Sequence, residues 1–393
     1  MSRLILHFDL DAFYCAVEAN LNLALHDVPF VVGGSIDARG VVASSSYRAR
    51  LYGVRSAMSM VEARRLCPGL VVVSARHGVY GDWSRRVMDV LYSVTPFVEQ
   101  LSIDEAFLDV SGFHTSLFDI AFGIQMTIRN ELGLPCSLGA ASNKLVAKIA
   151  NNIGKARSQN GQPPCAIEVV PPDEEARYLA PLPVRELWGV GPKTAETLYA
   201  LNIETIGDIA RQREQFMLHH FGKVGYDLWQ RAQGIDHRPI ETEHDTKSIS
   251  NETTFAQDVR DKDELRRVLR NLAEKVARRL RDQNLNGRTI QIKLRWSDFT
   301  TLTRQTTLTH AVQDDLIIAR EALHLLENNW SGQAVRLLGV GVSNLEDHAQ
   351  QLSLWETEKD KKSRQLQRTL DELKQRFGDD AIQRGSNLNP DDD

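Results

Sequence analysis

The sequence predicts a multidomain α+β fold, and three observations carry this prediction. Residues 3–153 alternate short apolar runs with amphipathic segments and contain one hairpin pattern. Residues 171–234 read as helical throughout, and residues 251–345 begin a second mixed unit of helices and strands. The length of 393 residues leaves room for about two to four domains.

Composition and cysteine usage are those of an ordinary globular protein. Hydrophobic residues make up 42% and charged residues 25% of the chain. No apolar run reaches the roughly 18–20 residues that span a bilayer, and the N-terminal residues lack a signal-peptide pattern. Without CxxC spacing, the four cysteines are expected to be buried thiols, which favours the reducing cytoplasm.

The net charge of −5 hides a local concentration of basic residues. Residues 260–310 contain 13 Lys and Arg against 6 Asp and Glu, whereas residues 347–393 contain 8 against 11. A basic body and an acidic tail can therefore offset one another. The acidic total does not exclude a nucleic acid partner.

The elements of the first half follow from apolar runs and their boundaries. A nearly continuous apolar run predicts a strand over residues 3–9, and Asp11 is expected to cap the helix of residues 12–24. Strands are then expected at 28–32, 41–45 and 70–74, and helices at 47–52, 58–67 and 81–92.

The next segments complete the first sheet. Two β-rich runs, 98–103 and 106–110, flank Asp104-Glu105 and predict a hairpin with the acids at its turn. A helix at 117–132, a strand at 136–141 and a helix at 143–153 follow, with Lys155 in the loop after them. Together the segments predict an α+β sheet with helices packed on one face.

The second half begins at a change in composition over residues 160–164. Residues 235–246 are polar and aperiodic and predict a linker after the helical segment. Beyond it we expect a long basic helix at 260–284, a strand at 289–296 and a helix at 314–328. In the polar tail, an apolar stripe predicts one helical stretch at 364–377.

Three acids stand at strand ends of the predicted sheet. Asp9 closes the first strand, and Asp104 and Glu105 lie between two apolar runs. Buried carboxylates are costly unless they are paired or bind a cation, and Mg²⁺ prefers such oxygens. The pattern therefore indicates divalent-metal binding suited to phosphoryl transfer. The alternative is a helix cap at Asp9 and a solvated turn at the other two acids.

Two further segments are suited to phosphate groups. Tyr47 and Arg50 share a helical face, and with Lys155 they are candidate donors to a triphosphate, although each can also be a solvated surface residue. The segment from Trp188 to Ala195 contains Gly189, Gly191 and Lys193 and fits a helix-hairpin-helix, whose free N–H groups bind a DNA backbone without reading sequence. The alternative for this segment is an ordinary turn between helices.

The polar tail contains one apolar cluster. Leu354 and Trp355 have no core to join, which favours a short docking peptide consisting of Gln351, Leu352, Ser353, Leu354 and Trp355. Packing of these residues on the chain's own surface is the alternative.

Four motifs in order resemble those of the Y-family translesion DNA polymerases, in particular the bacterial DNA polymerase IV type. They are Phe8-Asp9-Leu10-Asp11-Ala12-Phe13-Tyr14, Tyr47-Arg48-Ala49-Arg50, Ser102-Ile103-Asp104-Glu105-Ala106-Phe107-Leu108-Asp109, and the segment from Ser142 to Ala150. The hairpin and the tail peptide also fall where that family has them. The resemblance covers about residues 3–355.

The resemblance implies a role for each matching residue. Asp9, Asp104 and Glu105, with the Leu10 carbonyl, would hold two Mg²⁺ ions that activate a primer 3′-hydroxyl and hold the triphosphate. Tyr14 would be the steric gate that excludes ribonucleotides, with Phe13 beside it. Tyr47, Arg50 and Lys155 would contact the triphosphate of the incoming dNTP.

The resemblance also implies a right-hand polymerase architecture. The palm would comprise residues 1–10 and 77–166, the fingers 11–76, the thumb 167–235, a linker 236–246, the little finger 247–346 and a tail 347–393. Small fingers imply low fidelity and bypass of damaged template, and there is no room for a proofreading exonuclease.

The resemblance implies two macromolecular partners, primer-template DNA and a sliding clamp. It also implies that the protein is a monomer. Lys293, Arg295 and Arg304, with the basic helix, would contact template phosphates, and the tail peptide would bind the clamp. Where the family often has Val or Ile before the first acid, this chain has Phe8, preceded by His7, whose partner the sequence does not identify.

Two other functions would share part of this pattern. A catalytically dead relative would act only as a scaffold on DNA and the clamp, but such relatives lose the acids that this chain retains. A palm-type nucleotide cyclase would share paired metal carboxylates but would need neither a helix-hairpin-helix nor a clamp peptide.

Overall fold

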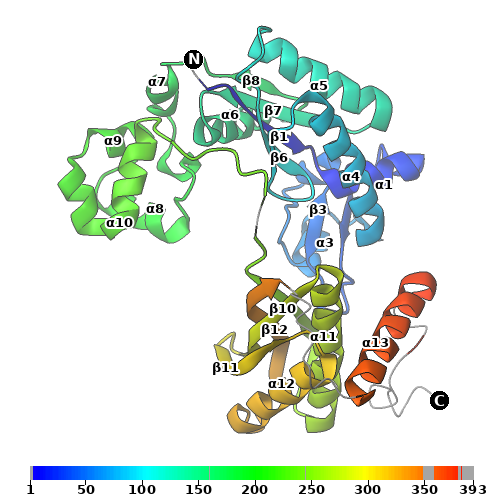
Figure 1. Ribbon diagram of the computed structural model, residues 1–393. Helices are drawn as coiled ribbons and strands as arrows, with labels where there is room; N and C mark the ends of the chain where they lie inside the picture. Colours follow the sequence, from blue (N-terminus) through cyan, green and yellow to red (C-terminus); the bar gives the residue numbers. More distant parts are fainter. Residues whose placement is uncertain (1–2, 159, 244, 348–357, 379–381, 383–393) are drawn as a thin grey trace. The chain divides into compact units, whose positions relative to one another are not determined.

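A computed structural model describes residues 3–158, 160–243, 245–347, 358–378 and 382. The chain divides into two compact units, residues 1–244 and 245–393 (Figure 1). Among the described residues, no helix combines the length and apolar character needed to cross a membrane.

A five-stranded sheet, in the order β5-β6-β1-β7-β8, organises the first unit. Its strands are β1 (Ile5–Leu10), β5 (Val98–Gln100), β6 (Glu105–Asp109), β7 (Cys136–Ala141) and β8 (Ile167–Val169). Strand β1 lies at the centre and pairs antiparallel with β6 and β7. The alternating side chains of β1 therefore point to two different layers of the protein.

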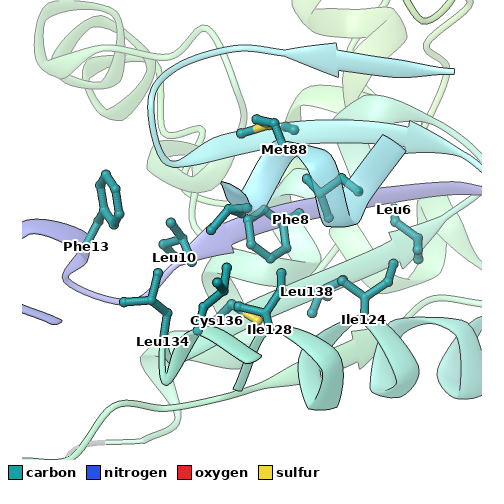
Figure 2. Packing of buried hydrophobic residues seen from close by; sticks show 14 of the residues in the cluster. Leu6, Phe8, Leu10, Phe13, Met88, Ile124, Ile128, Leu134, Cys136 and Leu138 are labelled. Atoms are coloured by element: carbon teal, nitrogen blue, oxygen red, sulfur yellow. The ribbon is translucent and has the colours of Figure 1, made fainter. Parts of the chain in front are cut away.

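Helices cover both faces of this sheet, so the prediction of helices on one face is wrong. On one face, β1 packs through Leu6, Phe8 and Leu10 against α4 (His77–Val94) and α5 (Leu117–Leu132) (Figure 2). On the other face, Ile5 of β1 packs with α6 (Lys144–Ala156) and with the helices that follow it. Strand β1 is thus covered on both faces, with Leu6, Phe8 and Leu10 on one side and Ile5, His7 and Asp9 on the other.

Two local predictions near the sheet also need correction. Ala12, in the left-handed conformation at φ 50°, precedes α1 (Phe13–Leu21), and Asp11 does not cap that helix. Asp11 is instead 1% exposed and accepts hydrogen bonds from Ser137 and from the Cys165 N–H. Helix α6 runs to Ala156, so Lys155 lies in its last turn and not in a loop.

A small three-stranded sheet, in the order β3-β2-β4, follows α1 in the chain. It consists of β2 (Phe30–Gly33), β3 (Val42–Ser45) and β4 (Val71–Ser74), with α2 (Tyr47–Arg50) and α3 (Met60–Leu66). Ser46 and Ser59 cap these helices by accepting from main-chain N–H groups. The cap at Ser46 fixes where α2 begins, directly after β3.

The helical prediction for residues 171–234 is confirmed. The helices are α7 (Glu175–Leu179), α8 (Pro192–Ala200), α9 (Ile206–Arg211) and α10 (Glu214–Ala232). Their buried side chains join those of α6 in one apolar cluster. The helical segment is therefore packed on the same sheet face as α6.

The second unit is a four-stranded antiparallel sheet in the order β11-β10-β12-β9. Its strands are β9 (Ser248–Val259), β10 (Leu285–Trp296), β11 (Thr301–Val312) and β12 (Val335–Asp347). Helices α11 (Lys262–Asp282) and α12 (Asp315–Asn329) pack against it in a shared core (Figure 1). Helix α13 (Glu358–Phe377) contacts α11 through the Arg281–Asp371 ion pair.

The contact between β7 and α6 is tight enough to predict a stability effect. A Cβ added at Gly139 would lie 2.0 Å from the Ala147 carbonyl and 2.4 Å from the Asn151 nitrogen. We expect Gly139→Ala to lower the free energy of unfolding by about 3 kcal/mol, because main-chain atoms cannot move aside cheaply. Denaturant unfolding measures the change.

Gly123→Ala is the matched control. Gly123 lies inside α5, and a Cβ there meets nothing within 4 Å. This substitution should raise stability by roughly 0.5–1 kcal/mol, as alanine does in a helix. Equal stability of the two variants would contradict the packing described for α6.

Candidate active site

One cavity of about 840 Å³ lies where the first sheet meets α1, α2 and α6. Eight of the nine residues expected to bind metal or nucleotide line it, and these are Asp9, Leu10, Phe13, Tyr14, Tyr47, Arg50, Asp104 and Lys155. Glu105 is the ninth and does not line the cavity. Residues about 150 positions apart in sequence are thus gathered around one space.

The acids come together because of the register between β1 and β6. Asp9 lies directly opposite Glu105, so their side chains point to the same face of the sheet. The Leu10 N–H donates to the Asp104 carbonyl at 3.0 Å, which continues the pairing past the end of β6. Helix α6 covers this face, with Lys148, Asn151 and Lys155 spaced along one side.

Lysine ammonium groups from α6 pair with two of the acids. Lys155 donates to Asp9, and its Nζ lies 3.3 Å from Oδ1 of Asp11. Lys148 donates to Glu105, which also contacts His7. These partners hold Glu105 beside α6. Among the residues that the structure describes, no three His, Cys, Asp or Glu side chains converge as a metal site.

Within the described residues, no lysine forms an ion pair of this kind with Asp104. Its Oδ1 accepts from the Ser102 hydroxyl at 2.6 Å. Burial raises the pKa of Asp104, the bond from Ser102 opposes that shift, and the charge of Asp9 adds to it. Two carboxylates beside one cavity, one of them already paired with an ammonium group, are a donor set that fits Mg²⁺.

The ring of Tyr14 is held by a stacked neighbour. Tyr80 of α4 lies almost parallel to it, with ring centroids 4.2 Å apart. The Tyr80 hydroxyl donates to Glu18 at 2.7 Å, and Arg76 donates to the same carboxylate. Phe13 packs against both rings. Tyr14 is therefore a rigid wall of the cavity and not a freely rotating side chain.

Tyr47 and Arg50 of α2 also line the cavity. The Arg50 guanidinium lies 4.3 Å from the centroid of the Tyr47 ring and donates from Nε to the Ser45 carbonyl at 3.1 Å. Burial raises the pKa of Tyr47, so its hydroxyl stays protonated as a donor. These contacts leave guanidinium N–H groups available to an anion.

The hairpin before α8 has the geometry expected for main-chain anion binding. Gly189 has φ 106°, and Gly191 precedes Pro192 at the first position of α8. Arg231 of α10 donates to the Trp188 carbonyl and so holds the turn against α10. Lys193 lies on the first turn of α8, beside its free N–H groups.

The strand register of the second unit separates the three predicted basic residues. Lys293 and Arg295 alternate with buried Ile292 and Leu294 and so share the face away from the helices. Arg304 lies opposite Ile292 and belongs to the helix-covered face, at the exposed edge strand β11. Lys293 donates to Glu252 at 2.8 Å, which reduces the basic character of the face away from the helices.

The predicted docking peptide, residues 351–355, lies outside the described residues. Of the basic helix α11, Arg266 pairs with Glu327 of α12 and Arg281 pairs with Asp371 of α13. Those two arginines are therefore engaged within the second unit.

Three residues around Glu105 were not predicted from the sequence in a functional role. His7 and Lys148 contact Glu105, and Asn151 contacts His7. The polar positions 148, 151 and 155 on one side of α6 could have identified Lys148 and Asn151.

Family models match most of the chain. The impB/mucB/samB family matches residues 8–152, its C-terminal domain matches residues 246–354, and the helix-hairpin-helix motif of the same family matches residues 172–203. The first match contains every residue that lines the cavity on β1, α1, α2 and the hairpin of Asp104.

Relatives and solved structures agree with these matches. The DNA polymerase IV of Dehalococcoides mccartyi strain 195 is 39% identical, covering 98% of this chain and 97% of its own. That of Desulfatibacillum aliphaticivorans is 40% identical, covering 97% and 96%. A Y-family DNA polymerase chimera of Dbh and Dpo4 superposes with a TM-score of 0.77 at 25% identity, covering 88% of this chain and 99% of its own.

The anchor of the Tyr14–Tyr80 stack predicts a pH dependence. Burial opposes ionisation of Glu18, but the bonds from Arg76 and Tyr80 outweigh it and lower the pKa of Glu18 below 4.5. A lowered pKa in the folded state adds stability above the unfolded value, and this stability is lost as the pH falls through the folded value. The melting temperature of Glu18→Gln should therefore lie a few degrees below wild type near pH 7.

The gap should narrow as the pH is lowered below about 4.5. Thermal melts of both proteins between pH 7 and pH 3.5 measure it. A constant gap over this range would show that the charge of Glu18 does not stabilise the fold.

Proposed function

Because the chain belongs to the impB/mucB/samB family of Y-family translesion DNA polymerases, we propose that its cavity is the polymerase active site. The enzyme is a template-directed DNA polymerase of the DNA polymerase IV type. It adds deoxynucleotides to a primer and copies damaged template with low fidelity. The proposal concerns which residues carry out each part of this reaction.

Asp9, Asp104 and Glu105, together with the Leu10 carbonyl, would hold two Mg²⁺ ions. When bound, the ions supply the charge that activates the primer hydroxyl and stabilises the departing pyrophosphate. The side chains orient the reactants: Asp9 and Asp104 stand beside the cavity, and Glu105 lies opposite Asp9 in the sheet.

Tyr47, Arg50 and Lys155 would bind the triphosphate. Lys155 donates to Asp9. If Asp9 holds a cation, the Lys155 ammonium group would be free to donate to a phosphate oxygen instead. The observation that carries the proposal is this arrangement of carboxylates and cationic donors around one cavity.

Tyr14 would act as the steric gate. Its ring lines the cavity and is stacked on Tyr80, so it cannot move aside to admit a 2′-hydroxyl group. The same proposal divides the chain into a palm (residues 1–10 and 77–166), fingers (11–76), a thumb (167–235) and a little finger (247–346).

DNA would be bound at two surfaces that contact its backbone without recognising base sequence. The hairpin of Gly189, Gly191 and Lys193 offers main-chain N–H groups to one strand, and Lys293 and Arg295 offer charge on the open sheet face. Arg304 would contribute from the edge strand. Residues 351–355 would bind a sliding clamp, which would tether the polymerase to DNA. The polymerase would be a monomer and act in the cytoplasm.

Removing one acid tests the catalytic assignment. Asp104→Ala should reduce primer extension with Mg²⁺ and dNTPs on the order of a thousandfold, because the cation loses a ligand where charge develops. Binding of primer-template, followed by fluorescence anisotropy, should change little. Asp82→Asn, at an exposed acid of α4, is the matched control and should extend primers normally. Normal extension by Asp104→Ala would remove Asp104 from the site.

Removing the gate tests nucleotide selection. Tyr14→Ala should raise ribonucleotide incorporation relative to deoxynucleotide incorporation by roughly tenfold or more, since the space below the sugar opens. Tyr14→Phe keeps the ring and should retain the wild-type ratio. Single-nucleotide insertion with each substrate gives the two ratios, and an unchanged ratio in Tyr14→Ala would exclude the gate.

Removing the tail peptide tests the clamp. Deletion of residues 351–355 should leave distributive synthesis unchanged and abolish stimulation by a sliding clamp, because the tether is lost. Deletion of residues 386–390, an equal length of the same tail, should preserve stimulation. Clamp stimulation of the first deletion at the wild-type level would contradict the docking role.

A further inference from the structure

A chain of buried polar groups runs from α6 to Glu105. Asn151 of α6 and His7 of β1 are both fully buried, at 0% exposed. The Asn151 Nδ2 lies 2.9 Å from the His7 Nδ1, and the His7 Nε2 contacts Oε1 of Glu105. Polar groups in such a place are costly unless they have hydrogen-bond partners. Within the described residues Nδ2 of Asn151 has such partners, whereas its Oδ1 has none.

The surroundings of Asn151 fix which end of its amide faces His7. Its Nδ2 also lies 3.3 Å from the His7 carbonyl oxygen and 3.2 Å from the Ser137 carbonyl oxygen. Carbonyl oxygens only accept hydrogen bonds, so the atom that faces them must be the amide nitrogen. Asn151 therefore donates a hydrogen bond toward the His7 ring.

That donor determines the tautomer of His7. A nitrogen that accepts a hydrogen bond carries no proton, so the proton of a neutral imidazole must lie on Nε2. Because Nδ1 accepts from Asn151, it carries no proton, and the ring has a single proton, on Nε2. The Nε2–H group then donates to Glu105.

The two partners of Glu105 meet the same oxygen. His7 and Lys148 both contact Oε1, and within the described residues no contact falls on Oε2. A carboxylate held at one oxygen can offer the other to a cation in a fixed direction. Glu105 lies opposite Asp9, so the free oxygen belongs to the face of the sheet that carries the proposed metal ligands.

We propose that His7 is a positioning residue for Glu105. The hydrogen bond from Asn151 keeps the His7 ring in the Nε2–H tautomer. The Nε2–H group donates to Oε1 of Glu105 and holds the carboxylate in place, so that Oε2 can bind a divalent cation. This inference rests on the proposed role of Glu105 in metal binding. It requires no change of charge on His7, because the hydrogen bond from Asn151 to Nδ1 leaves the proton on Nε2, and that proton is donated to Glu105.

The tautomer is measured directly by nitrogen-15 NMR of the full-length protein labelled at histidine. The resonance of His7 is assigned by its loss in His7→Gln. We expect a neutral ring protonated at Nε2, and Asn151→Leu, which removes the donor to Nδ1, should introduce the other tautomer. A His7 ring protonated at Nδ1 in the wild type would overturn the proposal, as would an unchanged tautomer in Asn151→Leu.

Metal affinity is measured with Mn²⁺ alone, by the loss of its free EPR signal, without DNA or nucleotide. His7→Leu should bind Mn²⁺ roughly tenfold more weakly than wild type, as expected when an outer partner of a ligand is lost. His7→Gln keeps an amide donor and should recover most of the affinity. His114→Gln, at an exposed loop position, should bind like wild type.

Wild-type affinity in His7→Leu would overturn the positioning role, and circular dichroism melts establish that each variant is folded. Glu105→Gln distinguishes the proposed metal-binding role of Glu105 from the positioning role of His7. If it binds Mn²⁺ as tightly as wild type, the proposed metal site at Glu105 is wrong, and the cation assigned to Oε2 is lost with it. Weaker binding in both Glu105→Gln and His7→Leu supports the proposal.

Discussion

Carboxylates on a covered sheet face need positive partners, and this requirement organises the first unit. Asp9 and Glu105 lie opposite one another on adjacent strands, and α6 lies over them. Without a cation, the charges are balanced by Lys155 and Lys148. A buried charge without a partner would cost several kcal/mol. The strand register and the placement of α6 are therefore parts of one electrostatic arrangement.

The same arrangement connects the resting protein to the proposed reaction. Lys155 lies between Asp9 and Asp11, while Asp11 itself is anchored by Ser137 and the Cys165 N–H. With a cation bound by Asp9, Lys155 would lose one of its two carboxylate partners, and its ammonium group would become available to a triphosphate. Metal binding and triphosphate binding would thus reinforce each other through one side chain.

Motifs and strong periodicity made much of this predictable from the sequence. The helix 117–132 and the strand 136–141 agree with α5 and β7, since long apolar patterns specify them. The second helical layer was missed because β1 gives no sign of which helices cover it. The burial of Asp11, the helical position of Lys155 and the Lys148–Glu105 pair depend on tertiary contacts between distant segments, which local patterns do not encode.

We infer that Lys155 of α6 holds, at Asp9, a place that a cation takes during the reaction. A crystal structure with primer-template, a non-reactive dNTP and Mg²⁺ tests it most directly. We expect Lys155 to have left Asp9 for the triphosphate, with the ions bound by Asp9, Asp104 and Glu105. Ions bound elsewhere, with the Lys155–Asp9 pair intact, would contradict it.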